Sequence, residues 1–181
     1  NKDRSISAWA ASVSGGKVLD AAWKPRVFAE LNAASGSSPA SSSHGTFDTL
    51  YPTGHGKYGN MDYQGWQNTV NLHLGVAAKP CAPLTLNADL FLYWLEDARD
   101  AWYNAGGAAN KGVGGKVLQD PSGAAGRRVG SELDLQATWS VNKDLIVSGG
   151  YSHFFPGSFI ERVNGAADGS DWVFVQTAWK H

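Results

Sequence analysis

The sequence predicts an all-β fold of antiparallel strands in up-and-down order, and three features of its 181 residues carry that prediction. Several stretches alternate apolar and polar residues with a period of two, which is typical of strands with one apolar face. No stretch of similar length has the period of about 3.6 residues that marks an amphipathic helix. Short and long connectors between the alternating stretches follow each other in strict alternation along the chain.

The alternation indicates seven strands. In the second, Val27, Ala29 and Leu31 share one face, and Arg26 and Glu30 lie on the other. The same division recurs in the later strands, although two consecutive glycines in LIVSGGYSHFF blur it. The expected strands are 5–13, 26–32, 70–76, 84–94, 132–139, 145–155 and 173–179.

Connector length separates the two ends of these strands. Barrels of the bacterial outer membrane have short periplasmic turns and long extracellular loops. Strands of about ten residues are long enough to cross a bilayer when tilted, and tryptophans near the strand ends are typical of an aromatic girdle. The sequence therefore predicts a transmembrane β-barrel. The expected short turns are 20–25, 79–83 and 141–144, and the expected long extracellular loops are 35–64, 97–128 and 157–170.

Composition excludes several other classes. Charge is balanced, with 15 Lys+Arg against 16 Asp+Glu, so we expect no nucleic-acid partner. The single cysteine, Cys81, cannot form an intramolecular disulfide. No apolar run approaches the roughly 18 residues of a transmembrane helix. The mean hydropathy of -0.29 suits a soluble protein, but also a barrel with one polar and one apolar face.

The number of expected strands predicts that the chain is part of a larger barrel. With the short turns periplasmic, seven strands place the N-terminus outside the cell, whereas bacterial barrels have an even strand number and two periplasmic termini. We therefore expect residues 1–181 to be the C-terminal part of a single barrel domain. The chain starts without Met or a signal peptide, as a processed or truncated product would. It ends in His181, where such barrels usually have Phe.

The polar face of the strands is expected to line the lumen and to set its selectivity. Glu132 and Asp134 share that face two residues apart, a spacing that would also suit a pair of acid and base groups. We instead expect them to pair with arginines of the lumen, such as Arg26, Arg127 or Arg128. The predicted lumen residues are Arg26, Glu30, Asn71, His73, Asp89, Arg127, Arg128, Glu132, Asp134 and Gln176.

The stretch HGTFDTLYPTGHGKYG, residues 44–59, has neither period and combines apolar side chains with turn residues, among them Gly54, Gly56 and Gly59. We expect an ordered extracellular loop that folds back toward the barrel mouth and narrows it. An ordered loop without a gating role is the alternative. The residues predicted to form the constriction are Phe47, Asp48, Tyr51, His55 and Tyr58.

The sequence offers no convincing metal or catalytic motif. His44 and His55 are eleven residues apart, which matches no common spacing of metal ligands, and we expect neither a metal nor a cofactor. Ser152 and His153 are adjacent in a strand, so their side chains point to opposite faces. Nucleophilic catalysis needs such a pair within reach of each other, so we do not expect an enzyme.

Four stretches resemble the alginate export family of outer-membrane β-barrels: AWKPRVFAELNAASG, HGTFDTLYPTGHGKYG, GSELDLQATW and GYSHFFPGSF. The resemblance runs from about Trp23 to the end, and FDTLYPTGH and HFFPG are its most specific parts. It implies a monomeric barrel of roughly eighteen strands. It also implies a bilayer and a polysaccharide as partners, with alginate passing through an arginine-rich lumen.

The expected function is passage of a hydrophilic, anionic solute, such as alginate or a related polysaccharide, through a polar lumen. The predicted lumen also carries carboxylates, which repel a polyanion unless cations lie beside them. A general porin for small solutes is therefore one alternative. A structural barrel that anchors or partners another envelope protein is a second, and a soluble β-sandwich that binds a ligand is a third.

Overall fold

The computed structural model describes residues 5–52, 55, 57–165 and 167–180, so Gly54, Gly56 and His181 lie outside the described residues. Its main element is a single sheet in which each strand pairs antiparallel with its neighbours along the chain. This order confirms the prediction of an all-β, up-and-down fold. The strands are β1 (Ala10–Val18), β2 (Arg26–Ala34), β3 (Thr69–Cys81), β4 (Leu84–Trp94), β5 (Arg128–Ser140), β6 (Leu145–Pro156) and β7 (Ser170–Trp179).

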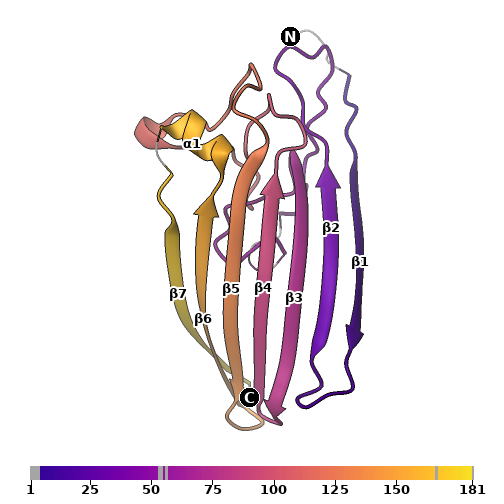
Figure 1. Ribbon diagram of the computed structural model, residues 1–181, viewed down its shortest axis with the longest axis vertical. Coiled ribbons are helices and arrows are strands. Elements are labelled where there is room, and N and C mark those ends of the chain that lie inside the picture. The colour runs from indigo at the N-terminus through magenta and orange to yellow at the C-terminus, as the bar shows by residue number, and fades with distance from the viewer. Residues whose placement is uncertain (1–4, 53–54, 56, 166, 181) are drawn as a thin grey trace.

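The two ends of the sheet differ, as the connector lengths predict. The short connectors lie at one end and the long ones at the other (Figure 1). The sheet is open, because β1 pairs only with β2 and β7 only with β6 among the described residues. The short connectors are 19–25, 82–83 and 141–144, and the long ones are 35–68, 95–127 and 157–169.

β1 begins later than its sequence pattern predicts, at Ala10 rather than near residue 5. Its central Ser-Gly-Gly stretch has little intrinsic preference for a strand. The backbone ladder to β2 overrides that preference, placing Ser14 opposite Glu30 and Gly15 opposite Ala29. The partner strand therefore extends β1 to Val18, beyond residue 13 where the sequence pattern predicts its end.

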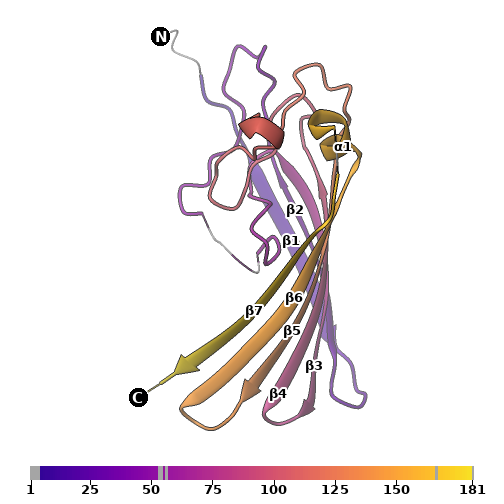
Figure 2. The same cartoon turned by 90° about the vertical axis from the view of Figure 1, so that its left-hand side faces the viewer.

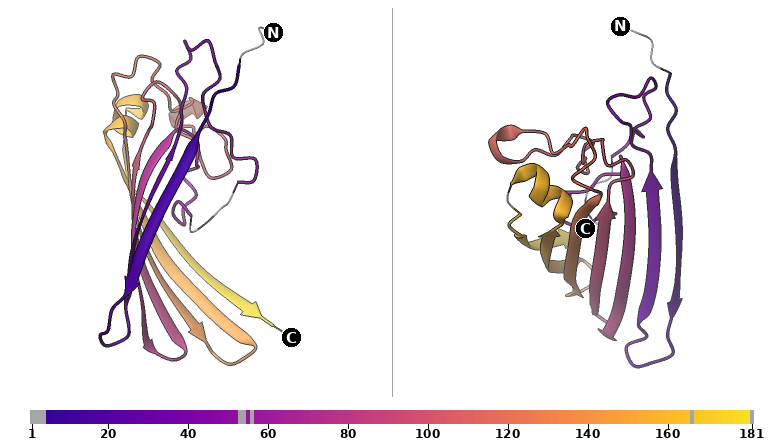
Figure 3. Two further views of the ribbon diagram at one scale, coloured as in Figure 1. Left: turned by 90° about the vertical axis from the view of Figure 1, so that its right-hand side faces the viewer. Right: turned by 45° about the horizontal axis from the view of Figure 1, so that its top comes forward.

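The two faces of the sheet differ in polarity. The outward face carries aliphatic side chains such as Leu74, Leu90 and Leu135, which are 36–42% exposed. The inner face carries polar side chains such as Asn71 and Glu132, both fully buried. Figures 2 and 3 show that the sheet is curved and twisted, with loop segments on its concave side. The inner face is the concave face.

Gly150 in β6 explains why the alternation blurs there. A Cβ on Gly150 would lie 2.3 Å from the ring of Phe174 on β7 and 2.9 Å from the carbonyl oxygen of Leu135. Phe174 lies opposite Gly150 in the register and covers the space of the absent side chain. The close approach of the ring requires a glycine at this position.

A hydrophobic cluster at the long-loop end joins strands to loops. Helix α1 (Ser158–Asn164), which the sequence pattern does not predict, contributes to it and is followed by Gly165 as its C-cap, with a φ of 76°. A second short element is the 3₁₀ turn η1 (Val113–Gly115). No helix in the part of the chain that the structure describes is long and apolar enough to cross a membrane. The cluster contains Phe91, Tyr93, Leu95, Trp102, Leu118, Ala125, Val129, Phe154, Phe159 and Ile160.

Asp100 links the two longest loops and is 4% exposed. It accepts hydrogen bonds from the Ser37 backbone N–H (2.8 Å) and the Thr46 hydroxyl (2.6 Å) of the first loop. In its own loop it accepts from the Ala101 N–H (2.7 Å) and the Tyr103 hydroxyl (3.0 Å). Burial raises the pKa of Tyr103, and the Asp100 charge raises it further, so this phenol stays a hydrogen-bond donor.

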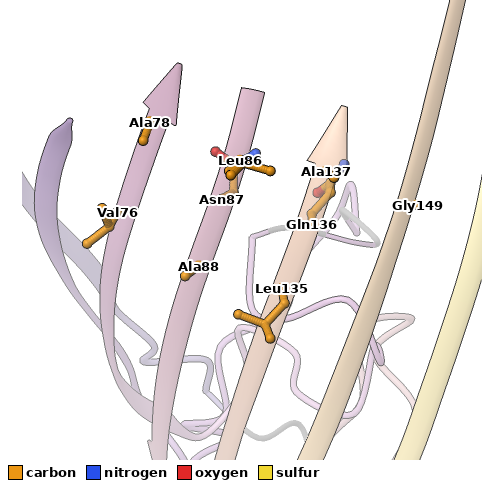
Figure 4. Close-up of a pocket in the computed structure, with 9 residues that line it drawn as sticks. All are labelled: Val76, Ala78, Leu86, Asn87, Ala88, Leu135, Gln136, Ala137 and Gly149. Carbon is orange, nitrogen blue, oxygen red and sulfur yellow. The ribbon is translucent and has the colours of Figure 1, made fainter. Parts of the chain in front are cut away.

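The outward face is hollowed across β3 to β6, where small side chains adjoin larger ones. The hollow has a volume of about 460 Å³, and its lining is mainly aliphatic. Such a surface lacks the convergent polar groups that orient a hydrophilic ligand. Figure 4 shows its lining residues, which are the outward-facing Val76, Ala78, Leu86, Ala88, Leu135, Ala137 and Gly149, together with Asn87 and Gln136, whose side chains alternate to the inner face.

Leu135 and Gln136 are neighbours in β5 that face opposite sides, so they provide a matched test of the two faces. In lipid vesicles, Leu135→Arg should lower the free energy of unfolding by about 2–4 kcal/mol, because it places a cation against acyl chains. Gln136→Arg adds a cation to the polar face and should cost less than about 1 kcal/mol. Denaturant unfolding followed by tryptophan fluorescence measures both losses. Equal losses would contradict the assignment of the faces.

Candidate functional site

The first long loop returns to the inner face of the sheet and runs along it. We call its residues 57–64 the inward segment. Tyr58 is 6% exposed, and its backbone oxygen accepts a hydrogen bond of 2.6 Å from the Tyr93 hydroxyl on β4. Figure 2 shows the loop that follows β2 on the concave side of the sheet. The inward segment therefore lies against the wall that the strands form.

Two carboxylates of β5 bind the backbone of the inward segment. The Asn60 N–H donates to Asp134 Oδ2 (3.0 Å), and the Met61 N–H donates to Glu132 Oε1 (2.9 Å). Gly59 has a φ of 99°, and a Cβ there would lie 2.5 Å from the Glu132 carboxylate. Only glycine combines this backbone conformation with so close a contact.

Side chains add two further polar contacts on this face. Lys57 Nζ lies 2.7 Å from Glu30 Oε1, and His73 Nε2 lies 2.8 Å from Asp89 Oδ1. Burial raises the pKa of Tyr58 well above its ordinary value, and the Glu30 charge raises it further, so the phenol stays neutral. The inward segment is held by its backbone, by one lysine and by one buried aromatic ring.

Aromatic rings cross the inner face beneath the loops. Successive ring centroids are 4.8 Å apart from Phe28 to His73, 4.0 Å from His73 to Phe91 and 6.2 Å from Phe91 to Tyr93. The row continues to Phe154 at 6.3 Å. Phe91, Tyr93 and Phe154 are at most 3% exposed. The long loops therefore cover this part of the wall.

The predicted lumen residues fall into three groups by exposure. The buried residues lie under the loops, which shield them from a passing solute. The exposed residues are accessible to a solute, although Arg127 and Arg128 lie at the long-loop end of β5. The role of all of them in selectivity stays a prediction. The buried ones are Asn71, His73, Glu132 and Asp134, the half-buried ones are Glu30 and Asp89, and the exposed ones are Arg26, Arg127, Arg128 and Gln176.

The residues predicted to form the constriction also differ in their exposure and in their contacts. Tyr58 is buried, Phe47 packs edge-on against a tryptophan of its own loop at 5.5 Å, and His55 stacks on a tryptophan of β7 at 5.8 Å. Asp48 is exposed, and Tyr51 is 88% exposed. Tyr58 and His55 thus contact the sheet, Phe47 contacts its own loop, and narrowing of the channel stays a prediction.

Glu132 and Asp134 bind the inward segment in place of the arginines predicted as their partners. Arg26 is on β2, which β3 and β4 separate from β5, so its side chain starts too far away. The pattern of the sequence did not predict the part played by Lys57. Lys57 is the only Lys or Arg between residues 35 and 64, and a lone cation facing an acidic wall is a usable signal for an ion pair.

Toward the short-turn end, the inner face carries uncharged polar side chains. The register places Asn87 opposite Gln136 and Thr85 opposite Thr138. Such amides and hydroxyls can both donate and accept hydrogen bonds with water or a hydroxylated solute. The set comprises Thr85, Asn87, Gln136, Thr138, Ser148 and Gln176.

The positions of the histidines bear on metal binding and catalysis. Within the ranges that the structure describes, no group of three or more His, Cys, Asp or Glu side chains could hold a metal ion. Ser152 is buried on the inner face, whereas His153 lies on the outward face, 2.7 Å from Asp171. Ser152 and His153 are thus placed on opposite sides of the sheet, where they cannot act as nucleophile and base together.

A curved antiparallel sheet with an aliphatic outward face, a polar inner face and long loops at one end has the organisation of the wall of an outer-membrane β-barrel. The chain belongs to the alginate export family, because the family model described as alginate export matches residues 1–174. This is a transport family of the bacterial outer membrane rather than a family of enzymes. A comparison with curated proteins gave no match.

Gly59→Ala tests how the inward segment is held. Its Cβ would collide with the Glu132 carboxylate, so we expect the segment to detach from the wall. Amide hydrogen exchange of the peptide that contains Asn60 and Met61 should become about tenfold faster. Gly114→Ala is the control, because Gly114 also has a positive φ (69°) but has open space around it. Equal exchange in native protein and the Gly59→Ala variant would refute this arrangement.

Proposed function

We propose that the chain forms part of the wall of an outer-membrane channel for a hydrophilic, anionic solute such as alginate or a related polysaccharide. The observation that carries the proposal is the inward segment, which Glu132 and Asp134 bind to the polar inner face. A segment held inside a barrel narrows the path. The groups exposed around it then set the selectivity.

The distribution of charge supports an anionic solute. Each carboxylate of the inner face has a donor within the protein: Glu30 has Lys57, Asp89 has His73, and the two on β5 have backbone N–H groups. The carboxylates of β5 also lie behind the inward segment. Their repulsion of a polyanion is therefore weaker than their number implies.

Arg26 is the cation best placed to attract an anion. It is exposed on the inner face of β2, and its guanidinium lies 4.8 Å from the centre of the Phe28 ring. Among the described residues it makes no ion pair. Its charge is thus available to a solute, while the neutral amides and hydroxyls near it supply hydrogen bonds.

Arg26→Gln tests the role of this cation in the intact protein. In planar bilayers, we expect the anion-to-cation permeability ratio to fall about twofold, because a lumen charge raises the local concentration of its counter-ion. Block by alginate oligomers should weaken in parallel. Lys143→Gln, in the exposed turn between β5 and β6, is the control and should leave both unchanged. If the Arg26→Gln variant kept the anion-to-cation permeability ratio of the native protein, Arg26 would have no role in selectivity.

The same recordings separate the alternatives. Current that alginate oligomers do not block would indicate a general porin for small solutes. Folded protein that carries no current would contradict the channel and favour a structural barrel that partners another envelope protein. In the Gly59→Ala variant, conductance above the native value would support a constriction formed by the inward segment.

A further inference from the structure

A second recess lies at the long-loop end, between the first two long loops and the segment that precedes β1. We call it the mouth cleft. It has a volume of about 600 Å³, and the lining residues that matter here are Trp9, Ser37, Ser41, Glu96, Asp97 and Arg99. We propose that the mouth cleft binds an uncharged saccharide. Binding of this kind needs no ion flow, so the proposal is independent of the channel function.

The lining has the chemistry that saccharides require. Six serines contribute to it, and each hydroxyl can both donate and accept hydrogen bonds. Trp9 is 50% exposed, which leaves its indole accessible to the apolar face of a sugar ring. An aromatic side chain beside a dense set of hydroxyls and carboxylates suits a ligand with alternating apolar and hydroxylated surfaces.

The cleft is built rigidly on the body of the protein. The Trp9 N–H donates to Ser35 Oγ (2.9 Å), and the Ser35 N–H donates to the Trp9 backbone oxygen (2.9 Å). On the opposite side, Glu96 accepts the Gly36 N–H at 3.0 Å, and buried Asp100 accepts the Ser37 N–H at 2.8 Å. A backbone held in this way loses little conformational entropy when a ligand binds.

The charges of the cleft favour a neutral ligand. Asp97 and Arg99 form an ion pair at 3.1 Å, so that among the described lining residues Glu96 is left as one net negative charge. Burial alone would raise the pKa of Asp97, but hydrogen bonds from Arg99 and the positive charges of Arg99 and Arg127 lower it overall. Asp97 is therefore ionised at neutral pH. An anionic saccharide would meet repulsion here that a neutral one does not.

The test is binding to the intact protein, purified in a detergent without a sugar headgroup so that the detergent does not compete. Isothermal titration calorimetry measures the affinity of the protein for a neutral glucose hexamer and for an anionic alginate hexamer. The difference shows how the charge of the saccharide affects binding. We expect the neutral hexamer to bind at least about fivefold more tightly than the alginate hexamer at low salt. Tighter binding of the alginate hexamer, or no binding of the neutral one, would overturn the proposal.

Two variants locate the bound saccharide. Trp9→Ala should weaken binding of the neutral hexamer about tenfold, because it removes the aromatic surface. Trp23→Ala, which removes a tryptophan of similar exposure (59%) from the short turn before β2, should leave binding unchanged. Glu96→Gln should strengthen binding of the alginate hexamer about threefold and change that of the neutral hexamer less than twofold. Native affinity in the Trp9→Ala variant would place the saccharide elsewhere and refute the assignment.

Discussion

The antiparallel backbone ladder is the constraint on which the rest of this structure depends. In hydrocarbon every backbone N–H and C=O must find a partner within the protein, so the strands must be long and paired without interruption. A continuous ladder sends successive side chains to opposite faces. His73 and Leu74 are neighbours in the chain, yet one lies buried on the polar inner face and the other contacts the outside. The ladder even holds Gly15 of β1 in a strand against its intrinsic preference.

A polar concave face creates a second requirement, because buried carboxylates need donors. The loops supply them. Backbone N–H groups of Asn60 and Met61 donate to Asp134 Oδ2 and Glu132 Oε1, and Asp100 accepts four hydrogen bonds, two of which join the two longest loops. The hydrogen bonds that these buried carboxylates accept therefore also fix the position of the loop in the proposed path of the solute. Stability and the proposed function share the same contacts.

The sequence predicted what depends on local pattern. Period-two alternation gave the strands and their faces, and connector lengths gave their up-and-down order. It did not predict helix α1, whose seven residues are too few to show a period and whose Phe159 and Ile160 are buried by contacts distant in the chain. Nor did it predict the partners of Glu132, because backbone N–H groups have no signature in a sequence. The stretch HGTFDTLYPTGHGKYG showed its order through composition, whereas its place against the wall depends on tertiary contacts.

The long loops cover the inner face at the long-loop end and leave it open at the short-turn end. The accessibility of this face to water is the most direct test of that arrangement. With Cys81 replaced by Ser, single cysteines can be introduced by Asn71→Cys and Gln176→Cys and treated with a membrane-impermeant thiol reagent in vesicles. Asn71 is fully buried and Gln176 is exposed on the same face. We expect Gln176→Cys to react at least about tenfold faster than Asn71→Cys. Equal rates at the two positions would show an uncovered wall and contradict the account.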